Sequence, residues 1–262
     1  MDLQLKDKVI MVAAGSKGLG FGIAEACARD GAIVCIASRS QENVDAAVAK
    51  LASYSGVAHG SIVDARSRES IQAWADEVLG HFGRIDGLVI NAGGPPAGRF
   101  DDFNEQQWYD AFELTLMSAV RMIHAVLPTM RQQGSGALLT VTSLSVKEPI
   151  DTILLSNVMR SGVVSLVKSL SKDIASEGIR INNLVPGTIY TDRVVSLNQS
   201  RSKMTGIPAE EIKVQAEAAI PMGRYGTPEE FGAAGAFLLS DAASYISGAT
   251  LVVDGALSKT VW

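Results

Sequence analysis

A glycine-rich segment, Gly15-x-x-Gly18-x-Gly20, lies between an apolar run at residues 9–12 and a segment of helical period that begins at Gly18. Glycines at a strand-to-helix turn let backbone N–H groups approach a pyrophosphate at the positive end of the helix. The spacing differs from the Gly-x-Gly-x-x-Gly of the commoner dinucleotide fingerprint, and a simple tight turn is the alternative interpretation. The segment predicts a phosphate site formed by Gly15, Ser16, Lys17, Gly18, Leu19 and Gly20.

The residues after the second apolar run, 33–36, indicate which dinucleotide would bind. An NAD site places a carboxylate here, where it accepts a hydrogen bond from the ribose 2′-hydroxyl. This chain has Ser38 and Arg39 instead, and no acid. A guanidinium binds a 2′-phosphate through two hydrogen bonds, and Lys17 adds a second positive charge nearby. Each basic residue alone is also compatible with a solvated surface charge, but together they favour NADP(H).

Strands and helices that alternate along the chain must position these residues. Short β-branched runs that are apolar on both faces are typical of a parallel sheet covered by helices on both sides. The expected strands are 9–12, 33–36, 57–63, 88–90, 137–142, 179–185 and 250–253. The expected helices are 18–30, 41–54, 67–82, 105–133 with a break near Phe112, 151–176 and 228–239.

The pattern predicts an α/β protein with a three-layer doubly wound Rossmann fold and a single parallel sheet of about seven strands. No linker-like shift in composition interrupts it, so residues 1–262 are expected to form one dinucleotide-binding domain. The more polar region around 192–219 is expected to be a small helical insertion that contributes to the substrate site.

Composition excludes several classes of protein. The chain carries 23 Lys and Arg against 28 Asp and Glu, a net charge of -5, whereas nucleic-acid and anionic-membrane binding both need an excess of basic residues. No run reaches the roughly 18 apolar residues of a membrane span, and the first apolar run is too short for a signal peptide. We therefore expect a mature cytoplasmic protein, with Cys27 and Cys35 as buried reduced thiols.

These motifs and three later ones resemble the short-chain dehydrogenase/reductase family over essentially the whole chain. The later motifs are Asn91-Ala92-Gly93, Pro186-Gly187, and Ser247-Gly248 with Val253-Asp254-Gly255. Residues 91–96 and 222–230 are similar to a 3-oxoacyl-acyl-carrier-protein reductase-like subgroup. The resemblance implies cofactor contacts from Asp64, Asn91, Gly93, Pro186, Gly187, Ile189 and Thr191.

The catalytic positions depart from the pattern of the family that the chain resembles. Typical members carry a Ser, a Tyr thirteen residues later that acts as general acid/base, and a Lys four residues after it. Ser143, Ser156 and Arg160 stand at these positions, and Thr115 replaces an Asn. Ser156 and Arg160 share one helical face, but an aliphatic hydroxyl is a poor proton donor at pH 7 and arginine does not deprotonate. Ser143, Ser156 and Arg160 are the expected catalytic residues of an atypical NADP-dependent oxidoreductase.

The sequence is compatible with two reactions and with one role that involves no catalysis. The enzyme could reduce a small carbonyl with a weak acid, or deliver hydride to the β-carbon of an enone and leave an enolate that needs only hydrogen-bond donors. Relatives with a similarly altered triad are associated with conjugate reduction. The alternative is a catalytically silent NADP(H)-binding protein that acts as a cofactor sensor or structural subunit. Tyr190, Lys147 and Glu148 are the candidates to replace the missing acid, and no metal ligand set is expected.

A small-molecule substrate is the expected partner, with no nucleic acid or membrane. Arg99, Arg193 and Arg201 could receive an acidic substrate or be solvated charges. The resemblance implies a homotetramer or homodimer that packs the helices around 105–133 and 151–176, where Ser161, Gly162 and Ser165 allow close approach.

Overall fold

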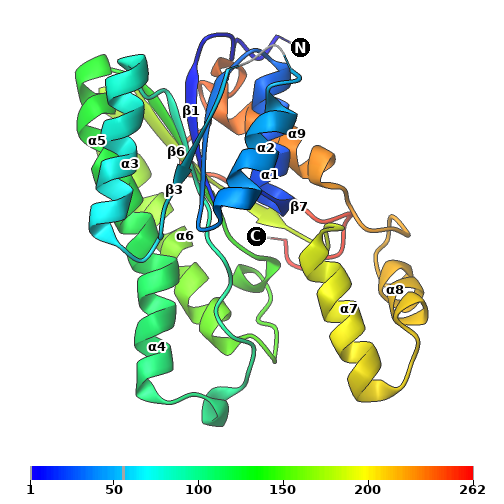
Figure 1. Cartoon of the computed structure of the whole chain (residues 1–262). Coiled ribbons are helices and arrows are strands. Elements are labelled where there is room, and N and C mark those ends of the chain that lie inside the picture. The colour runs from blue at the N-terminus through cyan, green and yellow to red at the C-terminus, as the bar shows by residue number, and fades with distance from the viewer. Residues whose placement is uncertain (1, 55–56, 262) are drawn as a thin grey trace.

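The computed structural model describes residues 2–54 and 57–261, and its strands form one parallel sheet in the order β3-β2-β1-β4-β5-β6-β7 (Figure 1). The strands are β1 (Val9–Ala13), β2 (Ile33–Ser38), β3 (Ala58–Ile62), β4 (Gly87–Ile90), β5 (Gly136–Val141), β6 (Ile179–Pro186) and β7 (Thr250–Val253). Met11 in β1 stands opposite Cys35 on one side and Leu88 on the other. The predicted Rossmann fold with a single parallel sheet is confirmed, while residues 1, 55–56 and 262 of the predicted domain lie outside the described residues.

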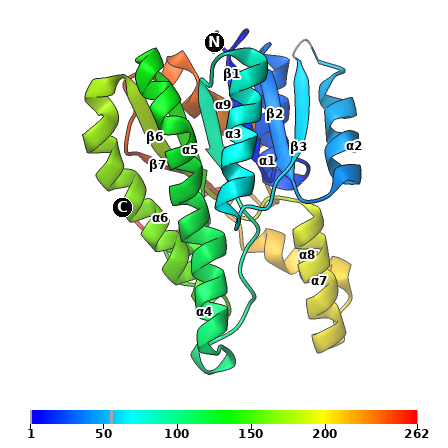
Figure 2. The same cartoon turned by 60° about the vertical axis from the view of Figure 1, so that its left-hand side comes forward.

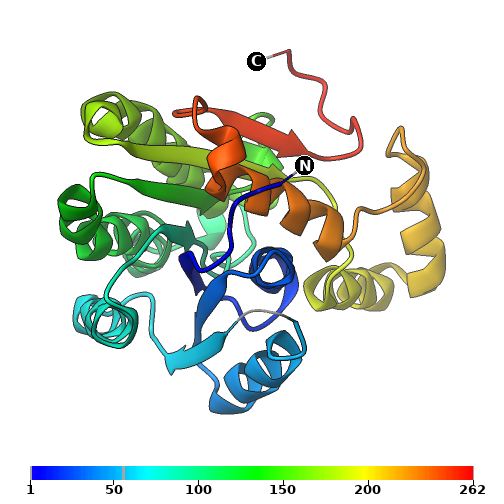
Figure 3. The same ribbon diagram turned by 90° about the horizontal axis from the view of Figure 1, so that it is seen from above.

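Helices cover both faces of the sheet. They are α1 (Gly18–Arg29), α2 (Gln41–Leu51), α3 (Arg68–Phe82), α4 (Glu105–Ala111), α5 (Ser118–Gln133), α6 (Leu154–Ile174), α7 (Asp192–Thr205), α8 (Ala209–Ala218) and α9 (Pro228–Leu239). Buried side chains of α3, α5 and α6, such as Trp74 and Met122, form one core, and those of α1, α2 and α9, such as Ile23 and Phe231, form the other. The three layers are visible in Figures 2 and 3.

Local sequence explains where several helices begin. The hydroxyl groups of Ser40 and Ser67 accept hydrogen bonds from the backbone N–H groups of Asn43 and Ser70, which caps α2 and α3. Thr227 caps α9 in the same way, and the Glu230 carboxylate accepts from the Thr227 N–H in return. Side-chain caps satisfy backbone donors that have no partner inside the helix, so these polar residues fix the start of each element.

The long helical stretch from α4 to α5 contains a six-residue π-helix, Phe112–Met117, at the place where the sequence predicts a break. The π-helix joins the two α-helices without interruption, so residues 105–133 form one helical stretch. By length and mean hydropathy (1.2) this stretch meets the minimum for crossing a membrane, and it is half buried in the protein. The stretch is long because the π-helix preserves the helix, but polar and charged residues interrupt it, so the expectation that no run reaches about 18 apolar residues is not contradicted. Its buried face packs in the core against the sheet, as in other core helices.

Both cysteines are free and buried, as predicted. Burial disfavours the charged thiolate and raises the pKa of Cys27 and of Cys35 to about 12. Neither thiol is therefore a reactive nucleophile at neutral pH.

Two glycines allow α1 and α9 to touch backbone to backbone. A Cβ atom on Gly22 would lie 2.2 Å from the Pro228 carbonyl oxygen, and one on Gly232 would lie 2.1 Å from the Gly22 carbonyl oxygen. Both glycines are buried in the helix pair. This contact holds α1, the helix that follows the glycine-rich segment, against a helix from the opposite end of the chain.

The order in which strands are added to the sheet reverses after β3. β4 returns to β1 and pairs in parallel with the edge of β1 that faces away from β2. Ligands of open α/β sheets bind beyond the carboxyl ends of the strands at such a switch point. Figures 1 and 2 show α4 and the α7–α8 pair extending past the same end of the sheet. The polar region predicted to be a helical insertion forms α7 and α8.

Candidate active site

The turn between β1 and α1 requires glycine at several positions. A Cβ atom on Gly15 would lie 2.8 Å from the Val12 carbonyl oxygen, and one on Gly20 would lie 2.5 Å from the Ala14 carbonyl oxygen. Gly18 has a φ of +59°, which disfavours other residues. Lys17 stands at the N-terminal cap of α1 and makes no side-chain cap bond. The turn thus presents the start of a helix whose backbone donors are available to a phosphate.

A cavity of about 500 Å³ lies beside this turn at the ends of β1, β2 and β3. It is lined by Ser16, Lys17, Ser38, Arg39, Asp64 and Gly93 from the predicted cofactor site, and by Ser40, Asn43 and Arg66. The structure therefore brings together the two basic residues that the sequence assigned to a 2′-phosphate. It adds Arg66 as a third cation that the sequence reasoning missed. The available signal was its position two residues after Asp64, at the end of the neighbouring strand.

Asp64 is held as a carboxylate at the rim of this cavity. Its side chain accepts a hydrogen bond from the Arg66 backbone N–H at 3.0 Å, and its Oδ1 lies 3.5 Å from Arg66 Nε. The backbone hydrogen bond is the main cause that holds the pKa of Asp64 below its usual value; the positive charges of Arg66 and Arg39 contribute as well. A carboxylate at this position can accept hydrogen bonds from a ligand. The negative charge of Asp64 also balances part of the positive charge of Arg66.

A second cavity, of about 430 Å³, adjoins the first at Ala92–Gly94 and lies over the ends of β4, β5 and β6. The predicted cofactor residues that line it are Leu19, Asn91, Gly93, Pro186, Gly187, Ile189 and Thr191. The predicted catalytic residues Ser143, Ser156 and Arg160 line the same cavity. A ligand that extends from the first cavity into the second would pass from the basic residues to these three side chains.

Ser156 and Arg160 form a hydrogen-bonded pair on α6, as their spacing predicts. Arg160 Nε donates to Ser156 Oγ at 3.1 Å, and Arg160 Nη1 donates to the carbonyl oxygens of Val141 and Thr142 at 3.0 and 3.2 Å. Burial, and to a smaller extent the charge of Arg193, lowers the pKa of Arg160 to about 10, so the guanidinium remains charged at pH 7. The pair therefore places a largely buried positive charge in the wall of the cavity.

Two further hydroxyl groups lie near this pair. Ser143 begins the short 3-10 helix Leu144–Val146, where its Oγ accepts a hydrogen bond from the Ser145 N–H at 3.2 Å. Thr115 lies in the π-helix and is buried, and its Oγ1 has no hydrogen-bond partner among the described residues. It lines a cavity of about 20 Å³ together with Arg160 and Asn91. This volume is enough for one water molecule.

The side chains that the sequence suggested as alternative acids lie elsewhere. Tyr190 is 48% exposed, stacks on Tyr225 at 6.2 Å and lies under Lys213 Nζ at 5.5 Å; it lines neither cavity. Glu148 accepts a hydrogen bond from the backbone N–H of Lys259, and Lys147 also lies outside the lining of both cavities. In this structure none of these three described side chains lines the cavity that contains Ser156.

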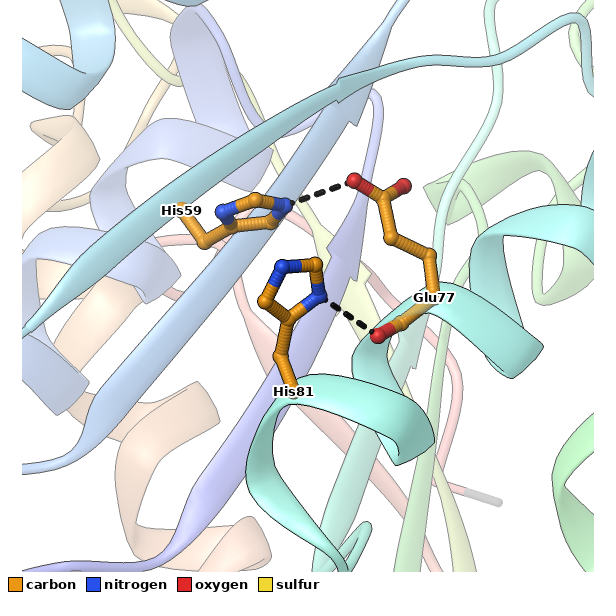
Figure 4. Close-up of side chains that lie close together, drawn as sticks. All are labelled: His59, Glu77 and His81. Carbon is orange, nitrogen blue, oxygen red and sulfur yellow. Dashed lines mark hydrogen bonds and ion pairs between the residues drawn. The ribbon is translucent and has the colours of Figure 1, made fainter.

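One group of potential metal ligands, His59, Glu77 and His81, comes together on β3 and α3, with ligand atoms within 4.8 Å of one another (Figure 4). Hydrogen bonds link it internally: Glu77 pairs with His59 Nε2 at 2.8 Å and with Ser61 Oγ at 2.9 Å, and His81 Nδ1 with the Glu77 carbonyl oxygen at 2.8 Å. Burial raises the pKa of Glu77, but the bonds from His59 and Ser61 outweigh it and hold the value low. The group lies at the beginning of β3, whereas both cavities lie at the strand ends, and it joins β3 to α3.

Comparison with known proteins places this arrangement in a family. Residues 13–258 match a family model described as enoyl-(acyl carrier protein) reductase. The chain is 33% identical over 252 residues to dehydrogenase/reductase SDR family member 4 of Oryctolagus cuniculus, which covers 96% of this chain and 94% of the relative. The chain belongs to the short-chain dehydrogenase/reductase family. The family resemblance inferred from the motifs is thereby confirmed.

Other members of the short-chain dehydrogenase/reductase family match over the full length. An uncharacterised oxidoreductase of Bacillus subtilis, YvrD, is 30% identical over 266 residues, which are 100% of both chains. The structure of L-sorbose reductase from Gluconobacter frateurii, complexed with NADPH and L-sorbose, superimposes with a TM-score of 0.95 at 28% identity and full coverage of both chains. Members of this family are oxidoreductases that use NAD(P), which confirms the prediction of a nicotinamide dinucleotide cofactor and of the oxidoreductase class.

Proposed function

We propose that this protein is an NADPH-dependent reductase of a small conjugated enone, with Ser143, Ser156 and Arg160 around the substrate oxygen. The observation that carries the proposal is that these three side chains share one cavity with the residues expected to hold the nicotinamide. Reduction of a simple carbonyl by a 3-oxoacyl reductase-like reaction is the second candidate, and it makes use of the same cavity.

The described residues fit NADPH. Glycines at positions 15, 18 and 20 leave room for a pyrophosphate where a Cβ atom would collide with backbone or strain the turn. Lys17, Arg39 and Arg66 line the cavity where a 2′-phosphate would lie. NADPH supplies a hydride when bound, so the remaining chemical task of the chain is to stabilise the charge that develops on the substrate.

The hydrogen bond between Arg160 and Ser156 determines what Ser156 can do. Because Ser156 Oγ accepts the hydrogen bond from Arg160 Nε, its own O–H hydrogen is free to donate, and the neighbouring positive charge makes it a stronger donor. The group stabilises an oxygen that becomes negative, in the way an oxyanion hole does. It does not release a proton at pH 7, because a serine hydroxyl is too weak an acid.

This limitation favours an enone over a ketone. Hydride addition to a ketone leaves an alkoxide, a strong base that needs a proton at once. Hydride addition to the β-carbon of an enone moves the π electrons onto oxygen and leaves an enolate, whose negative charge is delocalised. The enolate can persist while it accepts hydrogen bonds from Ser156 and Ser143, and water then protonates the α-carbon. The side chains of the cavity are therefore better suited to hydride addition to an enone than to a ketone.

NADPH oxidation with matched enones and ketones, for example 2-cyclohexen-1-one and cyclohexanone, tests the proposal. We expect turnover of the enone and little of the ketone. Ser156→Ala should lower kcat by about 100-fold or more, since loss of one oxyanion donor has an effect of this size, while Ser156→Thr, which keeps a hydroxyl, should retain most of it. The double change Ser156→Tyr with Arg160→Lys should raise ketone reduction.

Fluorescence titration with NADPH supplies the control. Tight NADPH binding without turnover of any enone or ketone would contradict the proposal and favour the silent NADP(H)-binding protein. Faster turnover of the ketone than of the enone would favour the carbonyl reductase.

A further inference from the structure

The cavity that holds Ser156 is electropositive. Arg160 is largely buried in its wall, and Arg193, on the first turn of α7, is exposed and lines it from the solvent side. No acidic residue lines the cavity within the described part of the chain; Asp192, the neighbour of Arg193, stays outside the lining. Two positive charges thus face a space with no opposite charge to balance them.

Arg193 differs from the other arginines that could receive an acid. A guanidinium nitrogen of Arg193 lies 3.2 Å from the place where Gly94 would carry a Cβ atom, so the glycine makes room for this side chain over the cavity. Within residues 2–54 and 57–261, Arg193 has no ion-pair partner, whereas Arg224 and Arg131, for comparison, each pair with a glutamate. Arg99 and Arg201 do not line the cavity.

The position of Arg193 is costly without a ligand. Positive charge near the N-terminus of a helix is unfavourable, because the helix dipole is itself positive there. The cap residue Thr191 makes no side-chain cap bond that would satisfy the first N–H groups of α7. The charge of Arg193 also acts unfavourably on Arg160. An anion in the cavity would offset all three effects.

The rest of the lining near Arg193 is apolar. It consists of Leu144, Ile150, Ile153, Val194, Leu197 and Leu257. An apolar wall combined with a positive charge on the solvent side fits a molecule with a hydrocarbon body and one anionic end. A carboxylate matches the planar fork of a guanidinium through two parallel hydrogen bonds.

We propose that the cavity takes a carboxylate-bearing substrate, whose carboxylate binds Arg193 while its hydrocarbon body lies on the apolar wall and its reducible group faces Ser156. The inference rests on the proposed function in one respect: it assumes that the substrate of the reductase occupies this cavity. Arg193 is then a specificity-determining residue, which holds the end of the substrate away from the reacting atoms.

Binding of two probes of the same shape tests this without turnover. Cyclohexanecarboxylate and cyclohexanecarboxamide differ in charge, and isothermal titration of each into the protein saturated with NADP⁺ measures the effect of that charge. We expect the carboxylate to bind at least about 10-fold more tightly, since hydrogen bonds to charged groups contribute on the order of one to two powers of ten. Arg193→Gln should abolish the difference, and Arg201→Gln, on the same helix but outside the cavity, should preserve it.

The affinity for NADP⁺ must be measured for each variant. Equal binding of the two probes, or binding of neither, would overturn the inference. A loss of NADP⁺ affinity in Arg193→Gln that matches the loss for the carboxylate would also overturn it, because Arg193 would then serve the cofactor phosphates. A protein that reduces no enone or ketone but still prefers the carboxylate would remove the proposed reductase function and leave the anion site standing.

Discussion

Arg160 makes its hydrogen bonds inward, to Ser156 and to the carbonyl groups at the end of β5. A lysine at this position could not bond all three oxygens in the same fixed geometry, because its ammonium is a single point at the end of a flexible stem. The side chain therefore does two things at once: it satisfies carbonyl groups that end a central strand, and it orients the Ser156 hydroxyl. We therefore expect the proposed reaction to depend on this anchoring as much as on the serine.

At the scale of single residues, the preference for NADPH is also testable. We expect Arg39→Ala to weaken NADPH binding by about 10-fold to 100-fold, because a charge-assisted bond to the 2′-phosphate is lost, and to leave NADH binding nearly unchanged. Fluorescence titration with both cofactors measures the ratio. Arg68→Ala, which removes an exposed charge outside the cavity lining, is the matched control. Equal weakening of both cofactors would contradict a 2′-phosphate contact.

The sequence predicted the Ser156–Arg160 pair because an i, i+4 spacing places two residues side by side on any helix. It could not predict that Arg160 also reaches Val141 and Thr142, since that depends on how α6 lies against β5. Arg66 was missed for a related reason. Its distance from Lys17 and Arg39 is set by the pairing of β1, β2 and β3, and no local pattern in the sequence carries it.

At the scale of elements, the contact between α1 and α9 depends on the absence of side chains at Gly22 and Gly232. We expect Gly232→Ala to destabilise the protein by about 3 kcal/mol, the upper end for overpacking, because the added carbon meets backbone that cannot move aside. Thermal unfolding should show a Tm lower by roughly 6–12 °C for a chain of this size.

Gly80→Ala is the control for this change. Gly80 lies in α3, and a Cβ atom there would have no neighbour within 4 Å. The same substitution should raise stability by about 0.5–1 kcal/mol, because alanine loses less conformational freedom in a helix. A destabilisation of similar size at both positions would contradict this prediction, because the loss at Gly232 could then not be assigned to the interhelical contact.

The elements themselves were largely predictable, since periodicity and capping residues are local signals. The predicted helix 41–54 ends earlier, at Leu51, and the predicted strand 57–63 is shortened to β3 at both ends. The expected break near Phe112 is a π-helix that preserves the helix axis. Such details follow from tertiary packing, which local propensity does not encode.

At the scale of the whole molecule, an exposed stripe on α6 is the candidate interface for the predicted homotetramer or homodimer. Val158, Ser161 and Ser165 lie on one helical face and are exposed. Gly162, also expected on that face, instead faces Leu116 of the same chain, with 3.2 Å from its would-be Cβ to the leucine side chain. Close approach of a second copy would therefore depend on the two serines.

We expect the protein to sediment as a multiple of the 27.6 kDa chain, and Ser161→Trp to shift it to the mass of a single chain. A bulky ring would prevent two α6 helices from approaching each other closely. Gln72→Trp, at an exposed position on α3, should leave the mass unchanged. Sedimentation equilibrium distinguishes the outcomes, and an unchanged mass for Ser161→Trp would show that this stripe lies outside the interface.

The packing of α1 on α9 has a consequence during protein synthesis. The glycine-rich turn between β1 and α1 leaves the ribosome long before residues 228–239, on which the helix that follows the turn is packed. In a nascent chain that still lacks α9, the face of α1 that packs on α9 is exposed, and the glycine-rich turn before α1 is not held in place by this contact. We therefore expect a nascent chain that has not yet reached α9 to bind NADP(H) weakly, because its glycine-rich turn is not held in place.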